Sequence, residues 1–157
     1  MLHVKLLESV MPIMRFGYIQ RKWIENHVEI IAKKYKMKSS DLNLMYFLRL
    51  NKEIETAKDI AKYTDLKRGN ISLIVEALFC RGYINQIAIE GDRRMKKLVL
   101  TPKCDEILEE LDEVVNTLMK ILLDGFSKED LETLRKNFKC MYENMEKEDS
   151  KSLEEKR

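Results

Sequence analysis

Apolar residues recur every three or four positions over most of the chain, a spacing that places them along one face of an α-helix. Near the N-terminus this row consists of Phe16, Ile19, Trp23, Ile24, Val28, Ile31 and Tyr35. The pattern predicts a main helix that has Pro12 in its first turn and runs to about Lys36, with residues 1–10 as a separate piece.

Helix-start and helix-stop residues divide the middle of the chain into three shorter helices. Ser39 or Ser40 is expected to cap the helix "DLNLMYFLRL". Thr56 and Asp59 have the spacing of a capping box at the start of "TAKDIAKY". The third helix lies in "RGNISLIVEALFCRG", whose last residue, Gly82, is of a type that commonly ends helices.

After Gly82 the period of the pattern changes from that of a helix to that of a strand. The segments "YINQIAI" and "KKLVLT" alternate apolar with polar residues on either side of "EGDRRM". Gly91 marks a turn between them. A β-hairpin is therefore predicted, with Arg93 and Arg94 at its tip.

Two amphipathic helices are expected after the hairpin, and residues 150–157 are interpreted as a polar, frayed tail. Thr101 followed by Pro102 has the form of a helix start, and Ser127 with Asp130 that of another cap. The apolar rows of the two helices are Ile107, Leu111, Val114, Leu118 and Ile121, and then Leu131, Leu134, Phe138, Met141 and Met145.

The predicted fold class is mainly α with a small β-hairpin, arranged as a winged helix-turn-helix. Residues 37–101 would form the DNA-binding reading head, in which Ile60 and Ala61 pack against Ile71 and Val75. The helices of residues 1–36 and 102–149 would form a dimerisation platform. Their apolar rows exceed what one chain can cover, which predicts a homodimer.

Composition and charge agree with a polyanion-binding domain. Apolar residues make up 45% and charged residues 36% of the chain, and no apolar run approaches the roughly 20 residues of a membrane span. We therefore expect a cytoplasmic protein without membrane contact. Residues 56–103 hold ten cations and five anions, whereas residues 104–157 hold nine and sixteen. A basic middle beside an acidic end is typical of a module that faces a polyanion.

The helix in "RGNISLIVEALFCRG" is the candidate recognition helix, because its start is polar and basic. Its predicted contacts with double-stranded DNA are Lys67, Arg68, Gly69, Asn70, Ser72 and Leu73. The major groove admits one helix, and recognition helices read mainly with their N-terminal residues. Lys67 and Arg68 are expected to contact DNA phosphates and not base edges. Asn70 and Ser72 suit base edges or phosphate, with ordinary helix-start polarity as the alternative explanation.

The hairpin is the candidate wing. Arg93 and Arg94 are expected to enter a minor groove, where negative potential is concentrated. Lys96 and Lys97 would flank the sugar–phosphate edge. Asp92 is interpreted as wing support that holds an arginine or a strand end by an ion pair. A solvated hairpin tip is the alternative explanation for the arginines.

The segments "DIAKYTDLKRGNISLIVEALFCRGYI" and "GDRRMKKLVLT" resemble the MarR (multiple antibiotic resistance regulator) family of transcription factors. Asp92 and Arg94 match the D-x-R of the family's wing, and Leu100 with Thr101 matches its "LT". The similarity covers about residues 39–110. It implies a homodimer with two reading heads on a pseudo-palindromic operator, whose repression or activation is released by a small molecule or a redox signal.

The sequence departs from the family pattern in three ways. Leu73 stands where the family often has a polar or basic residue, and either contact with thymine methyl groups or packing would explain it. Cys104 replaces a common glycine, and a depressed thiol pKa is considered for it. No cysteine precedes Cys80, which argues against sensing by an N-terminal thiol, and Cys80 itself is expected in the core.

The sequence offers fewer supporting residues for an effector pocket, a metal site or an active site. Trp23, Tyr35, Met45 and Tyr46 are candidates for a pocket that binds a small apolar or aromatic effector, with core packing as the alternative. No metal or cofactor site is predicted, because the two histidines lack partners at metal-ligand spacing. Without a nucleophile–base pair or a phosphate loop, the chain is not predicted to be an enzyme. The alternative function is a winged-helix module that binds protein without specific DNA binding.

Overall fold

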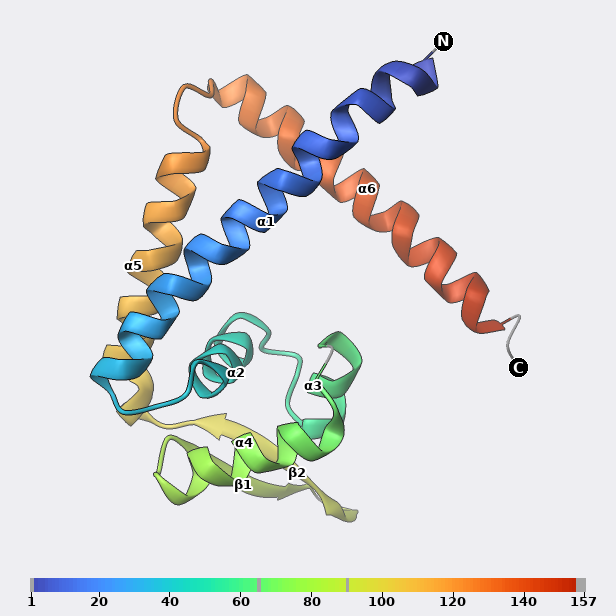
Figure 1. Ribbon diagram of the computed structural model, residues 1–157. Helices are drawn as coiled ribbons and strands as arrows, with labels where there is room; N and C mark the ends of the chain where they lie inside the picture. The colour runs from blue at the N-terminus through green and yellow to red at the C-terminus, as the bar shows by residue number, and fades with distance from the viewer. Residues whose placement is uncertain (1, 65, 90, 155–157) are drawn as a thin grey trace. The chain divides into compact units, whose positions relative to one another are not determined.

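The computed structural model describes the backbone of residues 2–64, 66–89 and 91–154 (Figure 1). Within these ranges the side chains of residues 2–11, 13, 92–94 and 149–154 lie outside the description. The chain divides into two compact units, Met1–Thr117 and Leu118–Arg157. Its elements are α1 (Leu2–Lys34), α2 (Ser39–Leu50), α3 (Ala57–Tyr63), α4 (Arg68–Cys80), β1 (Ile84–Ile89), β2 (Asp92–Leu100), η1 (Pro102–Cys104), α5 (Asp105–Leu122) and α6 (Lys128–Glu154).

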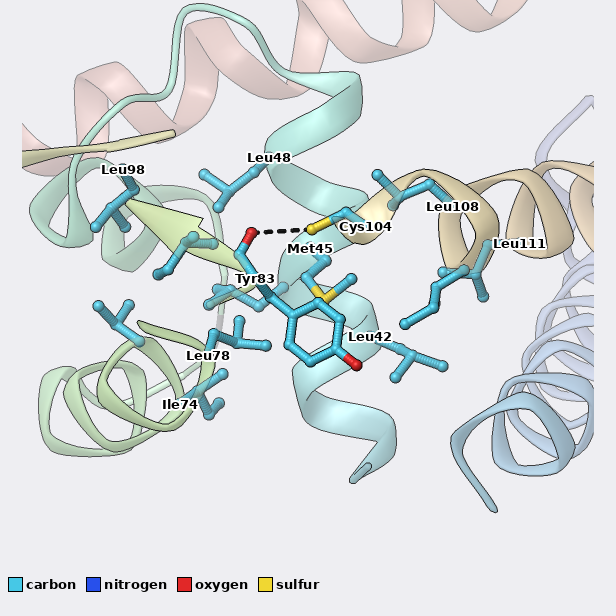
Figure 2. Packing of buried hydrophobic residues seen from close by; sticks show 14 of the residues in the cluster. Leu42, Met45, Leu48, Ile74, Leu78, Tyr83, Leu98, Cys104, Leu108 and Leu111 are labelled. Carbon is cyan, nitrogen blue, oxygen red and sulfur yellow. Dashed lines mark hydrogen bonds between the residues drawn. The ribbon is translucent and has the colours of Figure 1, made fainter. Parts of the chain in front are cut away.

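The first unit has a hydrophobic core built around α2 (Figure 2). Leu42 and Met45 of α2 are completely buried. Leu78 of α4, Leu98 of β2 and Leu108 of α5 are buried in the same cluster. Because α2 is apolar on more than one side, the recognition helix, the hairpin and the start of α5 all share this one core.

α1 is a single helix, and the break predicted near Pro12 is wrong. A proline inside a helix removes one main-chain hydrogen bond, but its fixed φ near −65° is itself helical. Among the described side chains of α1, those that are buried lie in its C-terminal part. Val28 and Ile31 are buried there, whereas Phe16 and Ile19 are 49% and 54% exposed.

The predicted capping box at the start of α3 is confirmed. The Asp59 amide donates to the Thr56 hydroxyl oxygen at 3.2 Å, and the Thr56 hydroxyl donates to the Asp59 carboxylate at 2.7 Å. Ser127 and Asp130 bond in the same way ahead of α6. These short-range contacts make each helix begin at a defined residue, because they satisfy amides that have no partner inside the helix.

The expected serine cap of α2 is wrong. The N-cap residue is Lys38, and Ser39 is already helical. The Lys38 amide donates to the carboxylate of Asp41 at 3.2 Å. An aspartate at the third helical position therefore replaces the serine hydroxyl as the group that fixes the start of this helix.

α4 ends at Cys80, and Gly82 terminates it as the sequence predicts. Gly82 has a φ of +74°, and its amide donates to the Phe79 carbonyl at 2.9 Å. The Tyr83 amide donates to the Leu78 carbonyl, also at 2.9 Å. This pair of bonds is a Schellman motif, which turns the chain sharply from α4 into β1.

β1 and β2 form the predicted antiparallel hairpin, with a change of register near its tip. Ala88 pairs with Lys96, but the next residue, Ile89, pairs with Asp92. Residues 93–95 are therefore extra residues on β2, which makes this end of the hairpin irregular.

A short third segment joins the outer edge of β2. The Leu98 amide donates to the Glu55 carbonyl at 2.7 Å, and Thr56 forms an isolated bridge with Lys97. The stretch "NKEIE" is too short to show strand alternation, so the sequence gives no signal for this pairing. The segment ties the start of α3 to the wing.

The second unit contains the end of α5 and the long helix α6. α6 is helical to Glu154, so the frayed tail predicted from residue 150 is wrong for residues 150–154, and residues 155–157 lie outside the described residues. Lysine and glutamate favour helix even where no apolar row is present. Across the described residues, no helix has the length and apolar character needed to cross a membrane.

Candidate nucleic-acid interface

α4 is held along one side by α3 and by the core. Ile60 of α3 and Ile71 of α4 are completely buried, and Val75 is 7% exposed. Ala61 is partly buried against the same cluster. The predicted packing of the two helices is therefore present, and it leaves the opposite side of α4 facing solvent.

The solvent side of α4 carries the residues predicted for recognition. Lys67, the N-cap residue, Arg68, Gly69, Asn70, Ser72 and Leu73 are all exposed. The Ser72 hydroxyl donates to the Arg68 carbonyl at 3.0 Å, so the hydroxyl oxygen remains able to accept. The structure thus gathers the predicted residues on one accessible surface.

Glu76, which follows Leu73 on the predicted outer face, lies on this side, and so does Cys80. Both are exposed, and the Cys80 thiol donates to the Glu76 carboxylate at 3.4 Å. That hydrogen bond raises the pKa of the Cys80 thiol. The expectation that Cys80 belongs to the core is wrong, because the buried row of α4 passes through Leu78.

The wing arginines belong to β2 and not to the turn. Gly91 is the turn residue, with a φ of +88° that glycine adopts most readily. Arg93 and Arg94 follow in the irregular part of β2. The side chains of both arginines and of Asp92 lie outside the described residues, so their roles at the DNA stay predictions.

Lys96 and Lys97 differ in their surroundings. Lys96 is exposed. The Lys97 ammonium group contacts the carboxylate of Glu55, on the segment that joins the edge of β2. Lys97 therefore has an ion-pair partner within the chain, and Lys96 is the better candidate of the two for a phosphate.

A hollow of about 350 Å³ lies where α3, α4 and the wing meet. Lys58 of α3 and Lys96 of β2 line it together with Ser72 and Glu76 of α4. Lys58 has no signal in the sequence, because its place beside α4 depends on how α3 and α4 cross. Two cations next to the exposed side of α4 attract phosphate, so Lys58 joins the candidate contacts.

Comparisons with known proteins agree with this geometry. Residues 37–104 match a family described as the winged helix DNA-binding domain. The transcription regulator MarR from Oenococcus oeni PSU-1 has a similar structure, with a TM-score of 0.60 and 21% identity over 83% of this chain and 98% of that chain. A MarR transcriptional regulator from Methanosarcina mazei Go1 is also similar, with a TM-score of 0.68 and 18% identity over 86% of this chain and 96% of that chain.

The MepR–DNA complex of S. aureus is also similar, with a TM-score of 0.54 and 18% identity over 83% of this chain and 96% of that chain. Residues 37–104 of this chain therefore match a winged helix domain, and the chain has the fold of these MarR regulators. The winged helix domain matched, 37–104, has almost the same bounds as the reading head predicted from the sequence, 37–101.

Outside the winged helix surface, the four candidate pocket residues have different surroundings. Met45 is completely buried in the core. The Tyr35 hydroxyl donates to Glu110 at 2.5 Å, and the Tyr46 hydroxyl donates to Asp112 at 3.1 Å. Burial and the contact with Glu110 raise the pKa of Tyr35 to about 12. Both tyrosines are therefore neutral hydrogen-bond donors. Tyr35 connects the end of α1 to α5, and Tyr46 connects α2 to α5.

Trp23 lines a separate cavity of about 270 Å³ between α1 and α5, together with His27, Glu110 and Glu113. The His27 ring stacks on Trp23 with 3.7 Å between centroids, and its Nδ1 donates to the Trp23 carbonyl at 2.7 Å. Because a carbonyl only accepts, Nδ1 carries the proton, and His27 has a structural role. Among the described side chains, no group of three or more histidine, cysteine or acidic residues is placed to hold a metal.

Cys104 is a core residue. It is completely buried, and its thiol donates to the Tyr83 carbonyl at 2.9 Å (Figure 2). Burial raises the pKa of this thiol, opposite to the depressed value considered from the sequence. Since the thiolate is the reactive form, the surroundings of Cys104 make it less reactive.

Proposed function

We propose that this chain is a cytoplasmic, homodimeric regulator of transcription that binds double-stranded DNA in a sequence-specific manner and acts as a repressor. Each copy would place α4 in the major groove and the wing in the neighbouring minor groove of a pseudo-palindromic operator. The observation that carries this proposal is the solvent-facing side of α4, which adjoins a hollow lined by Lys58 and Lys96.

The charge of the reading head supports DNA as the partner. Residues 56–103 hold ten cations against five anions, in a chain whose last third is acidic. Lysine and arginine that neutralise phosphates release bound counterions, which makes affinity fall steeply with salt. The similar fold of MepR, which was solved in complex with DNA, agrees with this choice of partner.

Exposed apolar side chains on the two long helices support the homodimer. On α1 these are Met14, Phe16, Tyr18 and Ile19, and on α6 they are Phe138, Met141 and Met145. Apolar residues at three- and four-residue spacing form the seam between paired helices. A second copy would cover these rows and would set two recognition helices on one duplex.

A footprint of the purified protein on DNA upstream of its own gene tests the proposal. We expect two protected half-sites whose centres lie about 10–10.5 base pairs, or a multiple of that, apart. Affinity for this site should fall steeply as salt rises. No retardation of any duplex at low salt would contradict DNA binding and would favour a winged-helix module that binds protein.

The wing is tested on the same DNA. Arg94→Ala should weaken binding by about 1–3 kcal/mol, the value of one arginine contact to a base edge. Arg135→Ala, which removes an exposed arginine from α6, is the matched control and should bind as the unmodified protein does. Equal affinity of the two variants would mean that the wing assignment is wrong.

Release by a small apolar or aromatic effector is part of the proposal, with the Trp23 cavity as its site. The indole supplies a stacking surface, whereas Glu110 and Glu113 make the lining acidic. We therefore expect neutral or cationic aromatic molecules to raise the melting temperature more than aromatic carboxylates do. A larger shift with the carboxylates would exclude this cavity as the effector site.

A further inference from the structure

The residues that project furthest from α4 are not its cations. Ile71, Ile74, Val75 and Leu78 form the buried row. With 3.6 residues per turn, the row directly opposite runs through Gly69, Leu73 and Glu76. This outward row has no positive charge, so it is not a phosphate-binding surface. In a major groove it would reach the floor, where base edges lie.

Leu73 is the prominent member of the outward row. Among the described residues it is the most exposed of the large hydrophobic side chains, at 72%. It lines a hollow with Asn70 and Ala77, but its exposure shows that packing within the chain does not account for it. An apolar side chain in this place gains nothing from phosphate, and it gains free energy when an apolar partner removes it from water.

The thymine C5 methyl group is the apolar group that bases present in the major groove. We propose that Leu73 is a specificity-determining residue, which packs on the methyl group of one thymine in each half-site. This inference rests on the proposed DNA binding and adds to it the base that one named side chain selects. The cations Lys67 and Arg68, at the start of the same helix, hold the neighbouring phosphates.

Gly69 lies one turn before Leu73 and supports the same placement. A Cβ atom added at Gly69 would meet no other atom of the chain within 4 Å. The backbone there is helical, so neither space nor conformation requires glycine, which is a poor helix former. Close approach of a partner to the helix is the remaining physical reason for a missing side chain. In the proposed complex, that partner is the floor or wall of the groove.

Removal of single methyl groups from the DNA tests the proposal. In duplexes of the footprinted operator, each thymine is replaced in turn by uracil, which lacks only the C5 methyl group. We expect one substitution in each half-site to weaken binding of the unmodified protein by about fourfold, the factor for one buried methyl group. Leu73→Ala should bind the thymine operator more weakly and should show no further loss with uracil at that position.

The matched control is Leu50→Ala, which removes the same side chain from a position on α2 that is 63% exposed. It should keep the uracil effect of the unmodified protein. A second variant separates folding from binding. Gly69→Ala should raise the melting temperature, because alanine is the better helix former, and should weaken operator binding. Thr133→Ala, an exposed change of similar kind on α6, should raise the melting temperature without weakening binding.

The outcomes separate this inference from the proposed function. If the unmodified protein binds no duplex, the proposed function itself fails. If it binds a specific operator but no thymine-to-uracil change weakens it, the assignment of Leu73 is overturned. The same conclusion follows if Leu73→Ala retains the full uracil effect, or if Gly69→Ala binds as tightly as the unmodified protein.

Discussion

In the winged helix domain the chain covers its own apolar side chains, whereas on α6 it leaves them exposed. Ile60 and Ile71 of the domain are completely buried, but Phe138 and Met141 of α6 are 59% and 61% exposed. Both regions have apolar residues at helical spacing. The difference teaches that such spacing predicts a face that will be buried and does not say which chain will bury it.

Element length and connection explain the contrast. The helices of the domain are 7 to 13 residues long, and the turns between them bring their apolar faces together. α6 has 27 residues, many of them exposed, and an apolar row of that length suits pairing with another long helix. We therefore expect substitutions in the two regions to affect different equilibria.

The largest expected effect is on folding of the domain. Ile71→Ala leaves a cavity in the core and should lower the free energy of unfolding by about 2–5 kcal/mol. Ser72→Ala, at the exposed neighbouring position, should change it by less than about 0.5 kcal/mol. Urea unfolding of both variants at one protein concentration measures this. Similar losses for the two would mean that the side chain of Ile71 is not in a packed core.

The next effect is on assembly. Phe138→Ala should weaken the homodimer by about 1.5–3 kcal/mol for each phenylalanine that the interface buries. Sedimentation at several concentrations should then show monomer where the unmodified protein is dimeric. Lys139→Ala, beside it on α6, is the control and should leave the dimer intact. A Phe138→Ala protein that remains dimeric at the lowest concentration would count against α6 as an interface.

A smaller effect is expected where the wing segment meets α3. Thr56→Ala removes the hydroxyl of the capping box and should lower the free energy of unfolding by about 1 kcal/mol. Thr133→Ala removes a threonine from an exposed position on α6, where no such loss is expected. Thermal unfolding compares the two variants with the unmodified protein, and a threonine cap without energetic value would leave the melting temperature of Thr56→Ala unchanged.

The smallest effect is a pH dependence at the junction of α1 and α5. Hydrogen bonds from Lys34 and then Tyr35 hold the pKa of Glu110 below its ordinary value. A lowered pKa in the folded state gives stability that is present above the unfolded pKa of 4.5 and is lost as pH falls through the folded pKa.

Glu110→Gln should therefore flatten the loss of stability below about pH 4.5. Denaturant unfolding between pH 3 and pH 7 measures the slope for both proteins. Glu109→Gln, at the exposed neighbouring position, is the control and should keep the slope of the unmodified protein. A steeper slope in Glu110→Gln would mean that the folded state raises the pKa of Glu110 and does not lower it.

Much of the fold could be predicted because the deciding interactions are local. The capping box at Thr56 and Asp59 and the glycine that ends α4 each depend on atoms a few residues apart. The apolar rows of the winged helix domain depend only on the 3.6-residue period of the α-helix. The exposed residues of α4 followed from the same row, since a helix buried on one side presents its other side to solvent.

The rest required the folded chain, because it depends on which distant residues meet. Lys58 lies beside α4 only through the crossing of two helices, and Lys97 meets Glu55 only through a third segment at the edge of the wing. The sequence alone determined the helices, the hairpin and the side of α4 that faces out. Tertiary structure decided which cations are free, that Cys80 is exposed, and that Met45 is core, since burial is a property of the packed neighbours and not of the residue.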